Sequence, residues 1–322
     1  MNKKVSLSSD AQTEHVNRDE MKLRSVAELP EHLAPAGVPS DYIVTPFGYF
    51  PPESVHEIGD NKEISQGPSS VPAERDENSS LIIKASDNLA GKEVDHTKPY
   101  DSATVYVNFY TFYDSQKISL FTGNCMVPHA PEAVTPDRPL CFNMGLEEKT
   151  GVAGIKSVLG WNLTRNECWS LSNWYTVGGA LYHTPLLKVS TGQKIEVSIK
   201  WLSSDDEGIK KSYRWMVNST ATSSTRGEQC SLTINTREKL NLLISPRITA
   251  VNTWTFKDFP PEGKIDFINV TALDENGDLL DLYSHWGFKN TSSYPFSFHK
   301  KGKPTSSSDI TLSWSDSDLK PS

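Results

Sequence analysis

Three histidines are the side chains in this sequence whose type most readily suggests acid–base or ligand chemistry. His183 stands at the end of a predicted strand, before the Thr184-Pro185 turn. Its position suits either a general base or ligand contact at the rim of a sheet, or a structural hydrogen bond to a loop carbonyl. His56 lies in an aromatic N-terminal segment that suits packing, and His129 lies in a predicted loop. No two histidines have the spacing of a local metal site, so no metal or other cofactor is predicted.

The carboxylates form no recognisable catalytic arrangement. Asp205, Asp206 and Glu207 make an acidic turn that suits either a calcium ion or an exposed hairpin tip. Glu196 and Asp266 form the one strand-borne pair of the kind glycosidases use, and the sequence does not show how their strands are related. The chain also lacks the Gly-x-Ser-x-Gly elbow of a serine hydrolase. The sequence therefore favours a binding protein over an enzyme.

Trp174 is the aromatic residue whose surroundings best suit a ligand. The predicted strand over residues 168–177 alternates, and Trp174 shares its face with Ser170, Ser172 and Thr176. An aromatic ring among hydroxyl groups suits the stacking of a sugar or another partly apolar ligand. It equally suits a packing contact with the N-terminal arm, and the sequence leaves both interpretations open.

The elements that must position these residues are predicted to be strands throughout. Residues 194–202 give the clearest signal, because Ile195, Val197 and Ile199 alternate with charged or polar residues. Further strands are predicted at residues 104–112, 140–144, 155–161, 168–177, 213–217, 232–234, 248–256 and 264–272. Turn signals rich in Gly, Pro and Asp separate them, with no helical period between. The pattern predicts an all-β antiparallel sandwich of the jelly-roll type.

Composition divides the chain into a sandwich and polar flanking segments. The expected organisation is a disordered segment at residues 1–40, an extended arm docked on the sandwich at 41–60, a linker at 61–80, the sandwich at 81–302 and a flexible tail at 303–322. A short helix is possible near residues 21–33 before the prolines that follow.

Charge, hydropathy and cysteine content exclude several classes of partner. The net charge is −8 and no basic stripe occurs, so nucleic acid is not expected. No run approaches the roughly 18 apolar residues of a membrane span, and no signal peptide is seen. The expected location is cytoplasmic, with secretion by a non-classical route left open. The four cysteines lack CxxC spacing and fit buried thiols or disulfides. The oligomeric state is not indicated.

Five motifs in a fixed order resemble those of a known group of proteins. They are Thr45-Pro46-Phe47-Gly48-Tyr49, residues 155–161, residues 169–175, Tyr182-His183-Thr184-Pro185 and Asp258-Phe259-Pro260-Pro261. The order resembles a family of uncharacterised bacterial and fungal proteins with a concanavalin A-like sandwich. It is more remotely similar to the eqolisins, which are glutamic peptidases on the same sandwich. The resemblance covers roughly residues 41–272 and implies the fold more than an activity.

The resemblance to eqolisins also implies which residues would have to act. An eqolisin pairs a glutamine with a glutamate across its concave sheet, and the matching positions here are Lys156 and Thr253, or Thr249 in a shifted alignment. Neither lysine nor threonine can supply the carboxylic acid. The nearest acids fall in predicted loops: Glu147, Glu148 and Asp258. Glutamic peptidase activity is therefore not expected.

The function predicted from the sequence is ligand binding on the concave face, with a carbohydrate or another small molecule as the partner. Lys156 would supply charge-assisted hydrogen bonds, Trp174 a stacking surface and Thr253 a hydroxyl, with His183 at the rim. Asn173 would join them only if its strand bulged there. The alternative is an enzyme with a remodelled pocket, acting on a glycan or an apolar natural-product intermediate. A third possibility is an interaction protein whose face is covered by its own arm.

Overall fold

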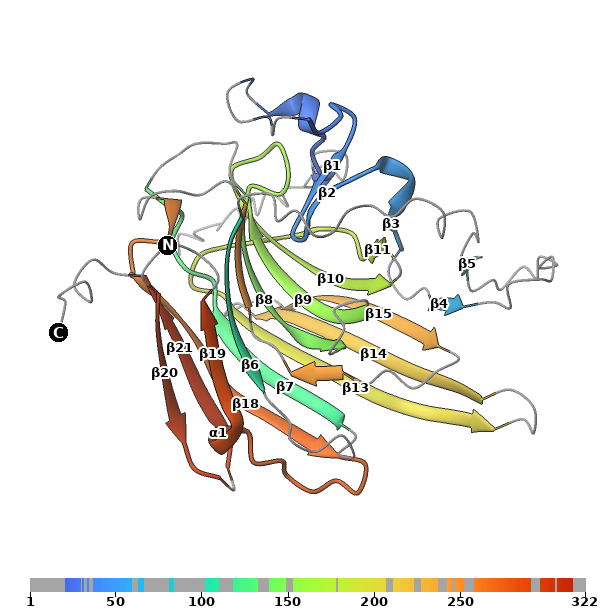
Figure 1. Cartoon of the computed structure of the whole chain (residues 1–322), viewed down its shortest axis with the longest axis vertical. Coiled ribbons are helices and arrows are strands. Elements are labelled where there is room, and N and C mark those ends of the chain that lie inside the picture. The colour runs from blue at the N-terminus through green and yellow to red at the C-terminus, as the bar shows by residue number, and fades with distance from the viewer. Residues whose placement is uncertain are drawn as a thin grey trace, which may run out of the picture.

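The computed structural model describes most of the predicted sandwich and part of the chain that precedes it. The described residues are 21–29, 31, 34, 37–59, 63–66, 81–83, 102–109, 118–132, 139–148, 153–177, 179–206, 211–222, 227–236, 242–244, 247–251, 258–290, 296–304 and 306–314. Their strands form two large sheets and one small hairpin (Figure 1). The helical turns with described bounds are η2 (Val26–Glu28), η3 (Pro52–Ser54) and α1 (Leu282–His285). The predicted all-β sandwich is confirmed.

The first sheet contains ten strands within the described residues. Across the sheet they are β19 (Trp286–Asn290), β6 (Ser102–Phe109), β17 (Arg247–Val251), β8 (Leu140–Glu148), β9 (Ala153–Trp161), β10 (Trp169–Val177), β11 (Ala180–His183) and β3 (Val55–Glu57), with β12 (Leu187–Val189) beside β10 and β16 (Leu242–Ile244) beside β8.

The second sheet contains nine strands within the same described part of the chain. Across the sheet they are β20 (Ser297–Gly302), β21 (Ser308–Ser313), β18 (Lys264–Asp274), β7 (Ile118–Met126), β13 (Lys194–Asp206), β14 (Lys211–Thr222), β15 (Gly227–Thr236), β4 (Glu63–Gln66) and β5 (Leu81–Ile83).

The hydrophobic core lies between the two sheets, where strands β9 and β10 contact β14. The alternation predicted for β13 is observed, since Ile195, Val197 and Ile199 are buried while Glu196 and Lys200 are exposed. Strand β9 differs because all nine of its residues are buried. One face of β9 meets the nine-stranded sheet, so its other face must be covered by a further part of the chain. We call that second face of the ten-stranded sheet the outer face.

The chain that precedes the sandwich adds parallel strands to both sheets. Strand β3 pairs with β11, and the N–H of Ile58 continues the ladder by donating to the carbonyl of His183 at 2.7 Å. Strand β4 pairs with β15, and β5 pairs with β4. Pairing of this kind covers sheet edges that would otherwise expose unpaired backbone groups. Strand β4 lies in the segment that was expected to be a linker, so that expectation does not hold for Glu63–Gln66.

A hairpin of β1 (Ile43–Thr45) and β2 (Gly48–Phe50) covers part of the outer face. Phe47 and Phe50 of this hairpin pack in one apolar cluster with Val158 and Trp174 of the ten-stranded sheet. Figure 1 shows the hairpin and β3 in blue beside β10 and β11. The hairpin and β3 thus contact the ten-stranded sheet through Phe47, Phe50 and Val55.

Two boundaries of the sandwich differ from those expected from the sequence. Met21, Val26 and Leu29 are buried, although residues 1–40 were expected to be disordered. At the other end, β21 pairs with both β18 and β20 and is followed by buried Trp314, so the tail predicted from residue 303 is part of the sheet there. Polar composition misled the prediction because every second residue of β21 faces outward.

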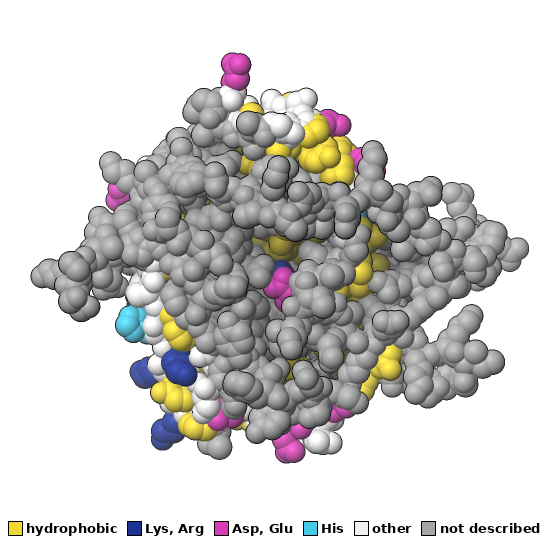
Figure 2. All heavy atoms as spheres, viewed as in Figure 1, with side chains coloured by type: hydrophobic (Ala, Val, Ile, Leu, Met, Phe, Trp, Pro, Cys, Tyr) yellow, Lys and Arg dark blue, Asp and Glu magenta, His cyan; other side chains and the backbone are white. Residues whose placement is uncertain are grey.

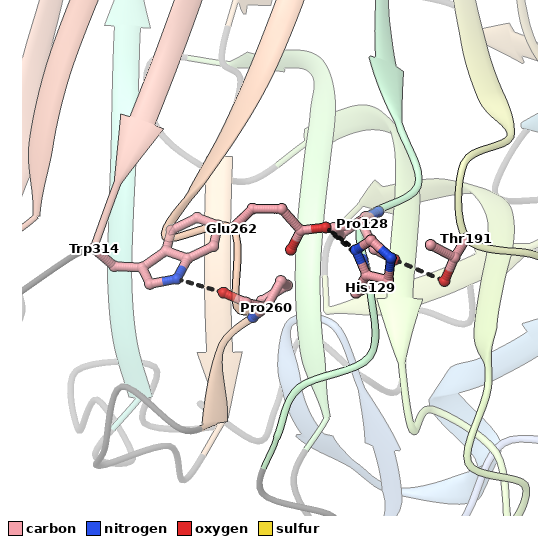
Figure 3. A network of polar contacts seen from close by, with 6 residues as sticks. All are labelled: Pro128, His129, Thr191, Pro260, Glu262 and Trp314. Atoms are coloured by element: carbon pink, nitrogen blue, oxygen red, sulfur yellow. Dashed lines mark hydrogen bonds and ion pairs between the residues drawn. The ribbon is translucent and has the colours of Figure 1, made fainter.

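A cluster of polar contacts joins three loops of the sandwich (Figure 3). The carboxylate of Glu262 accepts hydrogen bonds from the backbone N–H of His129 at 2.8 Å and pairs with the ring Nδ1 at 2.6 Å. Partial burial acts to raise the pKa of Glu262, but the contacts with His129 outweigh burial and hold this pKa below its ordinary value. Nearby, Thr191 donates to the carbonyl of Pro128 at 3.1 Å. His129 lies in a loop, as expected, and ties that loop to Glu262.

Three further observations concern the cysteines, metal binding and membrane-spanning helices. All four cysteines are free thiols, of which Cys125, Cys141 and Cys230 are buried. Among the described residues, no group of three or more His, Cys, Asp and Glu side chains could hold a metal ion. No helix in the described part of the chain is long and apolar enough to cross a membrane.

Candidate functional site

Three of the predicted site residues form one cross-strand row on the outer face. Lys156 of β9 lies directly opposite Trp174 of β10, and Trp174 lies directly opposite His183 of β11. Side chains that are directly opposite in antiparallel strands share a face, with Cβ atoms about 5 Å apart. The row therefore joins side chains from three neighbouring strands into one continuous surface.

Trp174 lies at the centre of this row and is completely buried. Its ring stacks on the ring of His183 with a centroid separation of 4.5 Å, and it makes an edge-to-face contact with the ring of Phe47 at a centroid separation of 5.6 Å. The indole N–H donates to the hydroxyl of Ser172 at 2.7 Å. Ser172, one of the hydroxyl residues expected on the same face as Trp174, thus supplies the polar partner that a buried tryptophan needs. In this structure the arm, through Phe47, takes the contact that a stacking ligand would make.

His183 is enclosed behind Trp174 and is neutral near pH 7. Its Nδ1 lies 2.8 Å from the carbonyl oxygen of Thr184, so Nδ1 carries the proton and donates. Burial lowers the pKa of the ring to about 4, opposed by the bond to Thr184 and assisted by the nearby ring of His56. The side chain is only 3% exposed. His183 therefore stacks against the ring of Trp174 and does not reach solvent.

Lys156 forms a buried ion pair with Glu147 of the neighbouring strand β8. Its Nζ lies 3.3 Å from Oε1 of Glu147, and the two side chains are 3% and 16% exposed. The ring of Phe47 lies over the same ammonium, with its centroid 4.8 Å from Nζ. Glu147 was expected in a loop, but β8 extends through Glu148, and Glu147 sits diagonally across from Lys156 in the β8–β9 register. The carboxylate is the member of the pair that reaches the surface.

Two glycines make room for the lysine side chain on the outer face. Gly145 lies directly opposite Lys156, and a Cβ added to Gly145 would come within 2.6 Å of the lysine Cγ and would also clash with the carbonyl oxygen of Ile155. A Cβ on Gly154 would lie 3.3 Å from the lysine Cε. The lysine therefore lies flat across β8 toward Glu147 because Gly145 has no side chain. Sequence reasoning missed this, although a glycine within a strand is a known sign of close approach.

Asn173 points to the opposite face of β10, into the space between the sheets. The β9–β10 register is regular from Trp169 to Val177, so no bulge turns Asn173 toward Trp174. Its amide donates to the carbonyls of Val217 at 3.2 Å and Cys230 at 2.9 Å. Its Oδ1 accepts a hydrogen bond from the hydroxyl of Ser219. Asn173 therefore joins the two sheets and is not part of the outer-face row.

Thr253, the remaining predicted ligand contact, lies outside the described residues, as do its neighbours 252–257. The backbone of Thr249, the position from the shifted alignment, lies in β17 opposite Cys141 of β8.

The outer face thus combines opposite charges with aromatic surface. Its members are Lys156, Glu147, Phe47, Trp174 and His183. Near the centre of the view in Figure 2, basic, acidic and hydrophobic side chains lie close together. Such a site can donate a hydrogen bond from the ammonium, accept one at the carboxylate and pack an apolar group against aromatic rings.

Comparison with known proteins finds only remote structural similarity. No family model matches the chain, and no curated protein matches it. The chain is similar to scytalido-glutamic peptidase, solved with a peptide-based transition-state analogue, at 11% identity and a TM-score of 0.41, covering 67% of this chain and 98% of that one. It is similar to SCP-B, an eqolisin-family peptidase solved with the tripeptide Ala-Ile-His, at 12% identity and a TM-score of 0.39, covering the same shares. The fold and the site define a β-sandwich protein with a covered ion pair on its outer face.

Proposed function

We propose that this protein binds a small, partly apolar molecule on the outer face of the ten-stranded sheet. The observation that carries the proposal is the ion pair of Lys156 and Glu147 beneath the ring of Phe47. Removing an ammonium group from water costs several kcal/mol, so a buried ion pair is weak evidence of a role in stability. A sandwich needs no such pair to fold. Gly145, opposite the lysine, adds space for its side chain, because a Cβ there would come within 2.6 Å of the lysine Cγ.

The chemistry of the pair indicates what the ligand must carry. Lys156 offers donors, Glu147 offers acceptors, and together they are electrically neutral. A ligand with an acceptor and a donor side by side can bond both groups, and an apolar part can pack on Phe47 and Trp174.

The second candidate is an enzyme that acts on a glycan or on an apolar natural-product intermediate. The observation in its favour is Glu147, a 16% exposed carboxylate beside an ammonium, which could take up or release a proton. His183 does not serve this role, since its ring is enclosed. A compound that the protein binds and also converts, with conversion but not binding lost in Glu147→Gln, would support the enzyme.

A ligand screen with matched lysine variants tests the proposal. Saturation-transfer NMR on a library of neutral small molecules and simple glycosides would be run with the unaltered chain, Lys156→Met and Lys200→Met. Lys200 is exposed on β13 and serves as the control. We expect at least one compound that the unaltered chain and Lys200→Met bind alike and that Lys156→Met binds at least tenfold more weakly. Absence of any such compound contradicts the proposal.

A further inference from the structure

Phe47 stands at the tip of the β1–β2 hairpin, where the turn directs it at the sheet. Thr45 fixes the turn, because its hydroxyl donates to the carbonyl of Gly48 at 2.8 Å and accepts from the N–H of Phe47 at 3.2 Å. Gly48 has a φ of +118°, which other residues rarely adopt. The hairpin thus presents one aromatic ring at a defined position.

The ring of Phe47 lies on the residues proposed to bind the ligand. Its face covers the ammonium of Lys156 at 4.8 Å, and it meets Trp174 at 5.6 Å with the planes inclined by 75°. These are the favourable geometries of a cation–π contact and of an edge-to-face aromatic pair. The position between Lys156 and Trp174 is therefore suited to a six-membered aromatic ring, and the chain supplies one from its own arm.

The hairpin can move without opening the core of the sandwich. Val44 and Tyr49 of the hairpin pack in a small cluster with Val26 and Leu29, whereas Phe47 and Phe50 pack on the outer face. Both clusters are separate from the core between the two sheets. The chain around the hairpin is fastened to the sandwich by main-chain pairing on both sides, at Leu23 with Thr164 and at β3 with β11. A tilt of the hairpin would move Phe47 while both attachments stay in place.

We infer that Phe47 occupies the ligand position in this structure, and that the ligand is a compound with an aromatic ring next to a neutral polar group such as a carboxamide. This inference rests on the proposed function. The ring of the ligand replaces that of Phe47 between Lys156 and Trp174. Its carbonyl oxygen accepts from Lys156, and its N–H donates to Glu147. A carboxylate in the same place would meet the charge of Glu147, so neutral ligands are preferred over acids.

The alternative is that Phe47 is a permanent wall of the site, and the two arrangements predict opposite effects of removing the ring. A wall contributes contacts to the bound ligand, so its removal weakens binding. An occupant competes with the ligand, so its removal strengthens binding by the free energy needed to displace it.

The experiment compares Phe47→Ala with the unaltered chain, using 2-phenylacetamide as the probe in NMR titrations. Phe50→Ala is the matched control, because it removes the same ring from the same hairpin. We expect Phe47→Ala to bind 2-phenylacetamide at least tenfold more tightly than the unaltered chain and Phe50→Ala to differ by less than threefold. 2-Cyclohexylacetamide and phenylacetate should each bind Phe47→Ala more weakly than 2-phenylacetamide. Binding by Phe47→Ala that is absent or no tighter than that of the unaltered chain overturns the inference.

Two further measurements keep the outcome decisive. If Phe47→Ala does not fold, Phe47→Leu replaces it, with the same expected direction and a contradiction if 2-phenylacetamide binds no tighter. Adding Lys156→Met to the Phe47 variant should abolish the gain, and a gain that persists places the probe elsewhere and overturns the inference. Failure of the inference alone is recognised when the library screen yields ligands that depend on Lys156 while Phe47→Ala gains nothing. Failure of both is recognised when no ligand depends on Lys156.

Discussion

Strands β9 and β10 carry buried polar side chains on both of their faces, and the two sets differ in what surrounds them. Between the sheets, Asn173 bonds the hydroxyl of Ser219 and two main-chain carbonyls, and the hydroxyls of Ser219 and Ser157 lie 2.7 Å apart, within hydrogen-bonding distance. On the outer face, Lys156 pairs with Glu147 beneath a hairpin that has its own small core.

The difference separates a structural polar network from a candidate site. The inner network takes its partners from the two sheets themselves, so it fixes how one sheet lies on the other. The outer pair is covered by a separate hairpin, and one of its members reaches solvent. Polar groups that are fully satisfied within the core add rigidity, whereas a covered pair that can exchange partners is available to a ligand.

The largest effect is expected when the inner network is broken. Asn173→Leu keeps roughly the same volume but leaves two carbonyls and one hydroxyl without this partner. Each buried group that loses a bond costs about 1–3 kcal/mol, so the free energy of unfolding should fall by about 4 kcal/mol. Urea unfolding measures this, with Asn124→Leu on the outward side of β7 as a control expected to cost less than about 1 kcal/mol. Equal losses in the two variants would contradict the structural role of Asn173.

Acid should destabilise the protein through His183 of β11, which lies beside β10 on the outer face. The unfolded ring binds a proton near its ordinary pKa of 6.5, whereas the folded ring does so only at about 4. Between these values the unfolded state binds more protons, so stability is fully present above pH 6.5 and falls as the pH decreases toward 4. The difference corresponds to about 3 kcal/mol.

The measurement is urea unfolding from pH 7 to pH 4 for the unaltered chain and for His183→Gln. His56, whose pKa burial also lowers, is present in both proteins and cancels in the comparison. The unaltered chain should lose about 3 kcal/mol more than the variant over this range. Parallel pH profiles would show that His183 is not held neutral.

A double-mutant cycle on Lys156 and Glu147 tests the outer-face pair, with a smaller expected effect on the free energy of unfolding. Glu147→Gln leaves a buried ammonium without its carboxylate, and Lys156→Met leaves a partly buried carboxylate without its ammonium. Each should destabilise the chain, while the double variant leaves no uncompensated charge. The double variant should therefore be about 2 kcal/mol more stable than the sum of the single effects. Additive effects in urea unfolding would mean that the two charges do not interact.

The all-β fold could be predicted from the sequence because alternation is a local signal. In β13 the buried residues Ile195, Val197 and Ile199 could be assigned without knowing their partners. Lys156, Trp174 and His183 were each named from the sequence, Lys156 from the resemblance to eqolisins, Trp174 from the alternation of its strand and His183 from its position at a strand end. What alternation could not supply was the covering of that face by Phe47.

Other features depended on contacts between distant segments. Glu147 follows Gly145 and precedes further charged residues, so it resembled a loop until pairing with β9 and β16 extended its strand. The partners of Asn173 lie on β14 and β15, and its inward direction became meaningful only once the facing sheet was known. The parallel pairing of β3 with β11 and of β4 with β15 likewise has no local signal in the sequence, because β3 and β4 have only three and four residues.

The most direct test of the outer-face site is a crystal structure of Phe47→Ala soaked with 2-phenylacetamide. The account predicts electron density for the ring between Trp174 and Lys156, with the carboxamide within hydrogen-bonding distance of both Lys156 and Glu147. Density at another place, or an outer face that holds no probe at saturating concentration, would contradict it.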